Sequence, residues 1–141
     1  MAKLTLRVDL SDQGVIGPGK IRLLELVGES GSISAAGRAM NMSYRRAWML
    51  IDNLNRCFRS PVVETQLGGM RGGGAVLSAL GHDVIARYRA IERGATKATA
   101  ADLAALDAAR TARHVPDGGG RRAAAVRSRR RSALMPRRSR T

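Results

Sequence analysis

Hydrophobic positions recur along the chain at two periods, and each period predicts a different kind of element. Over residues 3–10 apolar and polar residues alternate, which is typical of a half-buried strand. Pro18 suits the first turn of a helix, because a backbone N–H at that position would have no hydrogen-bond partner within the helix. We therefore expect a helix over 18–29, ended by Gly28 or Gly31.

The stretch 34–58 predicts two short helices joined by a tight turn at Asn41-Met42. Small residues over 34–40 indicate the first helix. Ser43 stands where a helix N-cap is expected, since its hydroxyl can accept a hydrogen bond from an unpaired backbone N–H. From there the apolar residues recur at steps of four, three and four, which places one face of the second helix in a core: Ala47, Ile51, Leu54 and Phe58. Trp48 adjoins this face, and we expect it in the core.

The opposite face of the second helix carries hydrogen-bond donors and one aromatic ring, with Asp52 as the only nearby acid. Its residues are Tyr44, Arg45, Arg46, Met49, Asn53 and Arg56. Two helices joined by a short turn, the second with a basic outer face, form the helix-turn-helix arrangement, in which the second helix enters the major groove of DNA. The same pattern also occurs where a basic face is only solvated, and many helix pairs bind nothing.

Beyond Pro61 the pattern changes to that of a β-hairpin, with strands over 62–65 and 75–77. The loop between them, 66–74, holds five glycines and can bring its backbone close to a partner. As a wing laid along DNA, it would place Arg71 at the phosphates or in the minor groove. The alternatives are an ordinary long hairpin loop and a phosphate-binding loop, but the loop lacks the Gly-Lys-Ser/Thr ending of the latter.

A last apolar stripe predicts a helix over 78–95, which either closes the core of its own domain or pairs with a second copy. Thr99 and Asp102 resemble a capping box before an alanine-rich segment. The fold class is therefore mainly α with a small β-hairpin. We predict a winged helix-turn-helix domain over 1–95, a short helix or helix extension within 96–113, and a disordered arginine-rich tail over 114–141, where little can be buried.

The formal charge of +14 is spread unevenly over the 141 residues. Residues 1–110 hold 15 Lys and Arg against 10 Asp and Glu, or +5, whereas residues 111–141 hold 10 against 1, or +9. Such an asymmetry is typical of a mildly basic folded module with a basic tail that meets nucleic acid or stays solvated.

Membrane and metal chemistry find little support in the sequence. No apolar run approaches the roughly 18 to 20 residues that span a bilayer, and the amino terminus lacks a secretory pattern, so a cytoplasmic protein with no membrane partner is expected. Cys57 is the only cysteine, which excludes an internal disulfide, and His82 and His114 have no partner at ligand spacing. We expect no metal site and no catalytic residue, and hence no enzyme.

Several motifs at this spacing resemble the amino-terminal winged-helix domain of the ModE family of molybdate-responsive transcriptional regulators. They are Gly31-Ser-Ile-Ser34, Met42-Ser-Tyr-Arg-Arg-Ala-Trp48, Asn53-Leu-Asn55, the glycine-rich run from Gly68 to Gly74, and Ala75-Val-Leu-Ser78 with Gly81. The resemblance covers residues 1–95, about two thirds of the chain.

The resemblance implies a homodimer that binds an inverted-repeat operator in double-stranded DNA and regulates transcription, typically of molybdenum transport genes. It implies that the long helix 78–95 takes part in the dimer interface. The implied DNA-binding residues are Ser34, Ser43, Tyr44, Arg45, Arg46, Met49 and Asn53, together with Arg71, Gly72 and Gly73 in the wing. Arg45 or Arg46 would bond a guanine edge, because a guanidinium can meet both guanine acceptors.

The tail departs from the family pattern, in which molybdate is sensed by carboxy-terminal β-barrel domains. It offers no strands for such a domain, so we expect no cofactor and no molybdate binding by this chain. Either the chain is a stand-alone DNA-binding form, or its sensor is another protein. The tail itself either adds phosphate affinity or arises from an altered reading frame.

Two other functions compete with a sequence-specific regulator. A low-specificity nucleoid-type protein would bind DNA through the charge of its tail. A protein-interaction module would use the winged helix to bind another protein, and its binding would survive the loss of Arg45 and Arg46.

Overall fold

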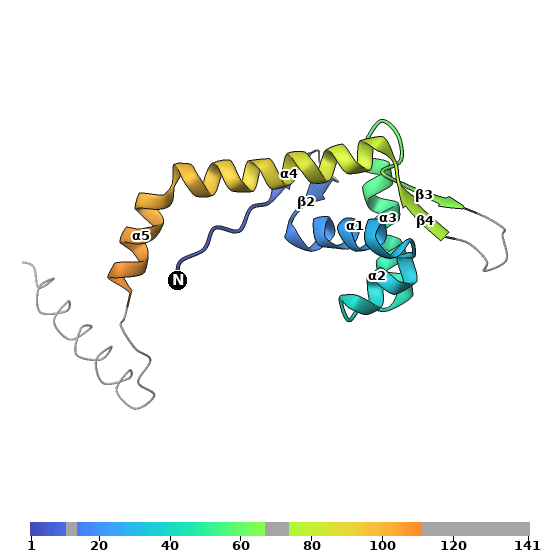
Figure 1. Ribbon diagram of the computed structural model, residues 1–141, viewed down its shortest axis with the longest axis horizontal. Coiled ribbons are helices and arrows are strands. Elements are labelled where there is room, and N and C mark those ends of the chain that lie inside the picture. Colours follow the sequence, from blue (N-terminus) through green and yellow to red (C-terminus); the bar gives the residue numbers. More distant parts are fainter. Residues whose placement is uncertain (11–13, 67–73, 111–141) are drawn as a thin grey trace, which may run out of the picture. The chain divides into compact units, whose positions relative to one another are not determined.

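The computed structural model describes residues 1–10, 14–66 and 74–110 (Figure 1). The chain falls into two units, Met1–Asp107 and Ala108–Thr141, and the elements up to α4 lie in the first. The helices and strands run in the order β1 (Val8–Asp9), β2 (Val15–Ile16), α1 (Pro18–Ser30), α2 (Ile33–Ala39), α3 (Tyr44–Cys57), β3 (Val63–Gln66), β4 (Gly74–Leu77), α4 (Ala79–Ala98) and α5 (Ala100–Ala109). Helices dominate, with two small antiparallel hairpins. This arrangement is compatible with a winged helix.

The first three helices confirm the predicted ones to within one or two residues at each end. Gly31 ends α1 in the left-handed conformation, at φ 72°, and its N–H donates to Val27 O. Asn41 turns the chain between α2 and α3 with a φ of 57°. Ser43 is the predicted N-cap of α3, and its Oγ accepts from the N–H of Arg46 at 3.1 Å.

The α2–α3 pair is held close by a residue without a side chain. A Cβ added at Gly37 would lie 2.9 Å from Cβ of Ala47, closer than two such carbons approach in proteins. The helices can therefore cross at this distance because position 37 is glycine. The face of α3 that was predicted to be buried is confirmed at Ala47, Ile51 and Leu54, which join one core with the buried side of α1.

The structure has a second hairpin that the sequence did not predict. The segment 3–10 forms a strand only at Val8–Asp9, which pairs with Val15–Ile16. The predicted alternation holds as far as Val8, because Leu4, Leu6 and Val8 are half-buried and the residues between them are exposed, but it fails at Leu10, which is 38% exposed. Tyr88 fixes this segment by donating its hydroxyl to Leu6 O at 2.7 Å, and burial raises the pKa of that hydroxyl.

We call the β3–β4 hairpin, with the loop between its strands, the wing, after the part that it corresponds to in the prediction. Its strands extend away from the helices (Figure 1), and Asn55 of α3 binds their base. Oδ1 of Asn55 accepts from Val62 N and Val63 N at 2.9 and 3.1 Å, and its Nδ2 donates to Val63 O at 3.1 Å. On the other strand, Ala75 N donates to Gly31 O at 3.0 Å. The wing is therefore fixed to α3 and to the α1–α2 turn.

Helix α4 begins at Ser78, whose Oγ accepts from Gly81 N at 3.0 Å. A Cβ at Gly81 would lie 2.2 Å from Val62 O, so only glycine lets α4 approach the wing this closely. The buried positions of α4, Gly81, Val84 and Tyr88, all fall in its first half.

The far half of α4 and the following helix bury little. The helix runs three residues beyond the predicted end at 95, to Ala98. Within the range 96–113, the helix α5 follows α4 over Ala100–Ala109 and buries no residue. Thr99 is the C-cap of α4, and its Oγ1 donates to Ala95 O at 2.7 Å. The predicted disorder of residues 114–141 lies outside the described ranges.

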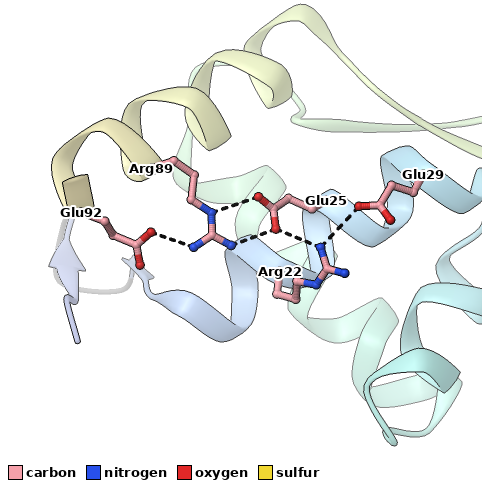
Figure 2. A network of polar contacts seen from close by, with 5 residues as sticks. All are labelled: Arg22, Glu25, Glu29, Arg89 and Glu92. Atoms are coloured by element: carbon pink, nitrogen blue, oxygen red, sulfur yellow. Dashed lines mark hydrogen bonds and ion pairs between the residues drawn. The ribbon is translucent and has the colours of Figure 1, made fainter. Parts of the chain in front are cut away.

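Five charged side chains join α4 to α1 (Figure 2). Arg89 donates to both carboxylate oxygens of Glu25, at 2.8 and 3.0 Å, and to Glu92 at 2.7 Å. Arg22 bonds Glu25 and Glu29 at 3.3 Å. The hydrogen bonds from Arg89 hold the pKa of Glu25 below its ordinary value, and both carboxylates raise the pKa of Arg89. This network fixes the direction in which α4 leaves the core.

Candidate nucleic-acid interface

The outer side of α3 is unusually exposed for its residue types. Tyr44, Trp48 and Met49 are 58%, 46% and 55% exposed, so three large apolar side chains of one helix are in contact with solvent. Arg45 and Arg46 are exposed beside them, and within the described residues neither guanidinium forms an ion pair or hydrogen bond. The nearby acid, Asp52, is paired with Arg56 one turn away. A helix of this composition has positive charge and apolar surface available to a partner.

Five of the predicted site residues line one open groove of about 390 Å³ along α3. The groove is bounded by Ser43, Arg45, Arg46, Met49, Leu50 and Asn53. The hydroxyl of Ser43 already accepts the capping bond from Arg46 N, so its role here is to fix the first turn of the helix. The two arginines and Met49 remain free to contact a ligand.

Asn53 is anchored by a residue that the sequence pattern did not indicate. Lys20 of α1 donates its Nζ to Asn53 Oδ1 and to Val15 O, both at 2.9 Å. This bond places a positive charge beside the far end of the groove. The two residues are 33 positions apart, and no local pattern links them, which explains why Lys20 was missed.

A second groove, of about 430 Å³, runs between α3 and the wing. Tyr44 and Trp48 line one side, and the wall opposite comes from the α2 amino terminus and the wing: Ser32, Ile33, Ser34, Thr65, Gln66, Gly74 and Ala75. The prediction that Trp48 is in the core was therefore wrong. Its ring lies on the flank of α3 between the buried face and the outer face, where nothing in the described residues covers it fully.

The remaining predicted residues are divided between α2 and the wing. Ser34 lies in the wing-side groove and accepts from Nη1 of Arg38 at 2.8 Å, which holds a further cation close to the α2 amino terminus. Arg71, Gly72 and Gly73 lie outside the described residues. The nearest described positions on either side of them, Gln66 and Gly74, line the wing-side groove together with Tyr44 and Trp48.

No helix within the described ranges is long and apolar enough to cross a membrane.

Comparison with known proteins confirms the resemblance. Over 82 residues the chain is 44% identical to the molybdenum-pterin-binding protein MopB of Rhodobacter capsulatus. These residues make up 58% of this chain and 30% of MopB. It is 36% identical over 92 residues to the molybdenum transport protein ModE of Azotobacter vinelandii, covering 65% of this chain and 33% of that protein. The DNA-binding transcriptional dual regulator ModE of Escherichia coli K12 is 36% identical over 87 residues, or 62% of this chain and 33% of the regulator.

No protein-family model matches the chain. The chain spans about a third of the length of the curated relatives it matches. Over about 60% of its own length, it is a homologue of the ModE and Mop proteins.

Proposed function

We propose that this chain is a transcriptional regulator that binds a specific sequence in double-stranded DNA. The observation that carries the proposal is the outer groove of α3, where Arg45 and Arg46 are exposed and free of carboxylate partners beside Met49. A helix with these side chains can enter the major groove, where a guanidinium bonds both acceptors of guanine. Relatives that are named transcriptional regulators support this assignment.

The other residues of the site contact the DNA backbone in this proposal. Lys20, held at Asn53, and Arg38, held at Ser34, are in position to neutralise phosphates on either side of α3. The wing would continue the contact through Arg71, with Gly72 and Gly73 allowing a close approach of the backbone.

We further propose that two copies pair through α4 and bind an inverted repeat. Ile91, in the half of α4 that buries nothing, is 47% exposed, and Leu106 of α5 is 66% exposed. An isologous contact across such positions would place two α3 helices on related half-sites. Sedimentation at micromolar concentration is expected to give a dimer, and a dimer that persists in Ile91→Asp would exclude this surface.

The names of the relatives connect those proteins with molybdenum. Molybdenum transport genes are therefore the first operators to test. The proposed role is regulatory, in the cytoplasm, and includes no chemical step.

One observation favours a second function. Residues 111–141 carry a formal charge of +9, enough for strong binding to phosphates without recognition of bases. The chain would then be a nucleoid-type protein of low specificity.

Selection of bound fragments from random DNA separates the two functions. The full chain and a protein ending at Arg110 are compared at about 0.15 M salt, where exposed electrostatic contacts are partly screened. We expect both proteins to enrich one palindromic motif. Binding by both without any enriched motif would contradict the proposed regulator and favour the nucleoid-type function.

A further inference from the structure

The wing-side groove differs in chemistry from the outer groove of α3. Its α3 wall consists of two exposed aromatic rings, Tyr44 and Trp48, whereas the outer groove is bordered by guanidinium groups. The opposite wall carries short polar side chains, Thr65 and Gln66 from the wing and Ser34 from α2. A ligand in this groove would therefore meet apolar rings on one side and neutral hydrogen-bonding groups on the other.

The exposure of the rings requires an explanation, because the fold could have covered them. Trp48 is 46% exposed and Tyr44 is 58% exposed, although Ala47 between them is fully buried. A tryptophan left half in solvent gives up a large part of the free energy that its burial could contribute. In DNA-binding helices such apolar surface is useful, because one base edge in the major groove carries an apolar group.

That group is the C5-methyl of thymine, which apolar side chains recognise by contact. Guanine and cytosine present only hydrogen-bonding groups in the major groove, so an aromatic wall gains less from them. The groove also borders the amino-terminal half of α3, the part of a recognition helix that contacts base edges. Its position is continuous with the proposed DNA surface, since Tyr44 and Arg45 are adjacent in the chain.

We propose that Tyr44 and Trp48 form a thymine-recognising surface in the wing-side groove, distinct from the guanine contact at Arg45 or Arg46. The inference rests on the proposed function. It divides base recognition between two sides of one helix. An operator half-site would then contain a guanine and, displaced toward the wing, one or more thymines whose methyl groups are covered by the two rings.

Replacing thymine with deoxyuracil tests this directly, because the exchange removes the methyl group and leaves every hydrogen-bonding group in place. The full chain is titrated with its selected DNA site, in which each thymine is exchanged in turn. We expect binding to weaken about fourfold for each methyl group that the rings cover, the effect of burying one apolar carbon. Exchanges elsewhere in the site serve as internal controls.

Variants then connect the effect to the rings. In Trp48→Ala the difference between thymine and deoxyuracil should shrink at the affected positions, whereas Trp48→Phe should retain it. Leu10→Ala is the matched control, since it removes an exposed apolar side chain, 38% exposed, that lines neither groove. Circular dichroism of each variant shows whether the fold is kept, and the wild-type comparison needs no variant at all.

The outcomes separate this inference from the proposed function. Absence of any preferred site would contradict the proposed function itself. A preferred site that binds equally well with thymine or deoxyuracil would overturn the thymine surface and leave the regulator intact. Trp48→Ala could also weaken binding to every DNA site equally and leave the deoxyuracil effect unchanged. That result would mean that the ring contacts the DNA backbone, and it would overturn the inference.

Discussion

The two longest helices of the core domain, α3 and α4, are built alike and use their arginines differently. Each begins at a serine whose Oγ accepts a backbone N–H three residues later, from Arg46 in one case and Gly81 in the other. Each buries one face in the same core. In α4, however, Arg87 is paired with Asp83, and Arg89 with Glu25 and Glu92.

In α3 the arginines at the amino-terminal end have no such partners. Arg45 and Arg46 are exposed, and the described residues supply no carboxylate to either. The two helices therefore show that the number of arginines does not identify a binding surface. What distinguishes the amino-terminal half of α3 is that two adjacent arginines without partners lie beside three exposed large apolar side chains, those of Tyr44, Trp48 and Met49.

The largest effect should come from removing that uncompensated charge. Arg45→Ala with Arg46→Ala is expected to weaken binding to the selected DNA site by about 1 to 3 kcal/mol if one arginine bonds a guanine and by about 2 to 6 kcal/mol if both do. Arg87→Ala is the control, because its guanidinium is already paired in α4. Fluorescence anisotropy with labelled DNA measures both, and equal losses in the two proteins would contradict the contrast between the helices.

The next largest effect should come from disrupting the contact that places α4 against the wing. Gly81→Ala should lower the free energy of unfolding by about 3 kcal/mol, because its Cβ would meet the backbone oxygen of Val62 at 2.2 Å. Gly94→Ala, in the same helix with open space around it, should raise stability by about 0.5 to 1 kcal/mol.

Urea denaturation of the two glycine variants gives both values. A stable Gly81→Ala protein would mean that α4 can shift away from the wing without loss.

Local patterns were sufficient to predict most of the helices. Ser43 predicted the start of α3, since an N-cap depends only on neighbours within one turn along the chain. The apolar spacing predicted which face of α3 is buried. The two-residue strand β2 was missed, because two residues cannot display a period.

The errors concern contacts between distant segments. Trp48 adjoins the buried face of α3 on the helix, and only the position of the wing decides whether anything covers it. The anchoring of Asn53 by Lys20 and of Glu25 by Arg89 joins residues 33 and 64 positions apart. Periodicity carries no information about such pairs, so the sequence predicted a basic face without its division into two grooves.

Loss of the Arg89 network of α4 should lower the stability of the fold by an intermediate amount that depends on pH. Arg89→Gln is expected to lower stability at neutral pH by about 1 to 2 kcal/mol, between the values for exposed and for charge-assisted buried hydrogen bonds. The pKa of Glu25 is lowered in the folded chain, so its stabilisation is present above the ordinary carboxylate pKa and is lost as the pH falls through the folded value.

Wild type and Arg89→Gln should therefore converge in stability in acid. Denaturation of both proteins at about pH 7 and about pH 3, on either side of the ordinary carboxylate pKa, measures this. A difference that is unchanged at the lower pH would mean that Arg89 stabilises the fold by packing rather than through Glu25.

The smallest effect should follow from the other arginine pair of α4. Arg87 and Asp83 lie one turn apart, with side chains 77% and 50% exposed, so solvent screens their attraction. Arg87→Ala should change the free energy of unfolding by no more than about 0.5 kcal/mol, at every protein concentration tested. A larger loss that grows with protein concentration would contradict this and would place Arg87 in the contact between two copies, because only an assembled species responds to concentration in that way.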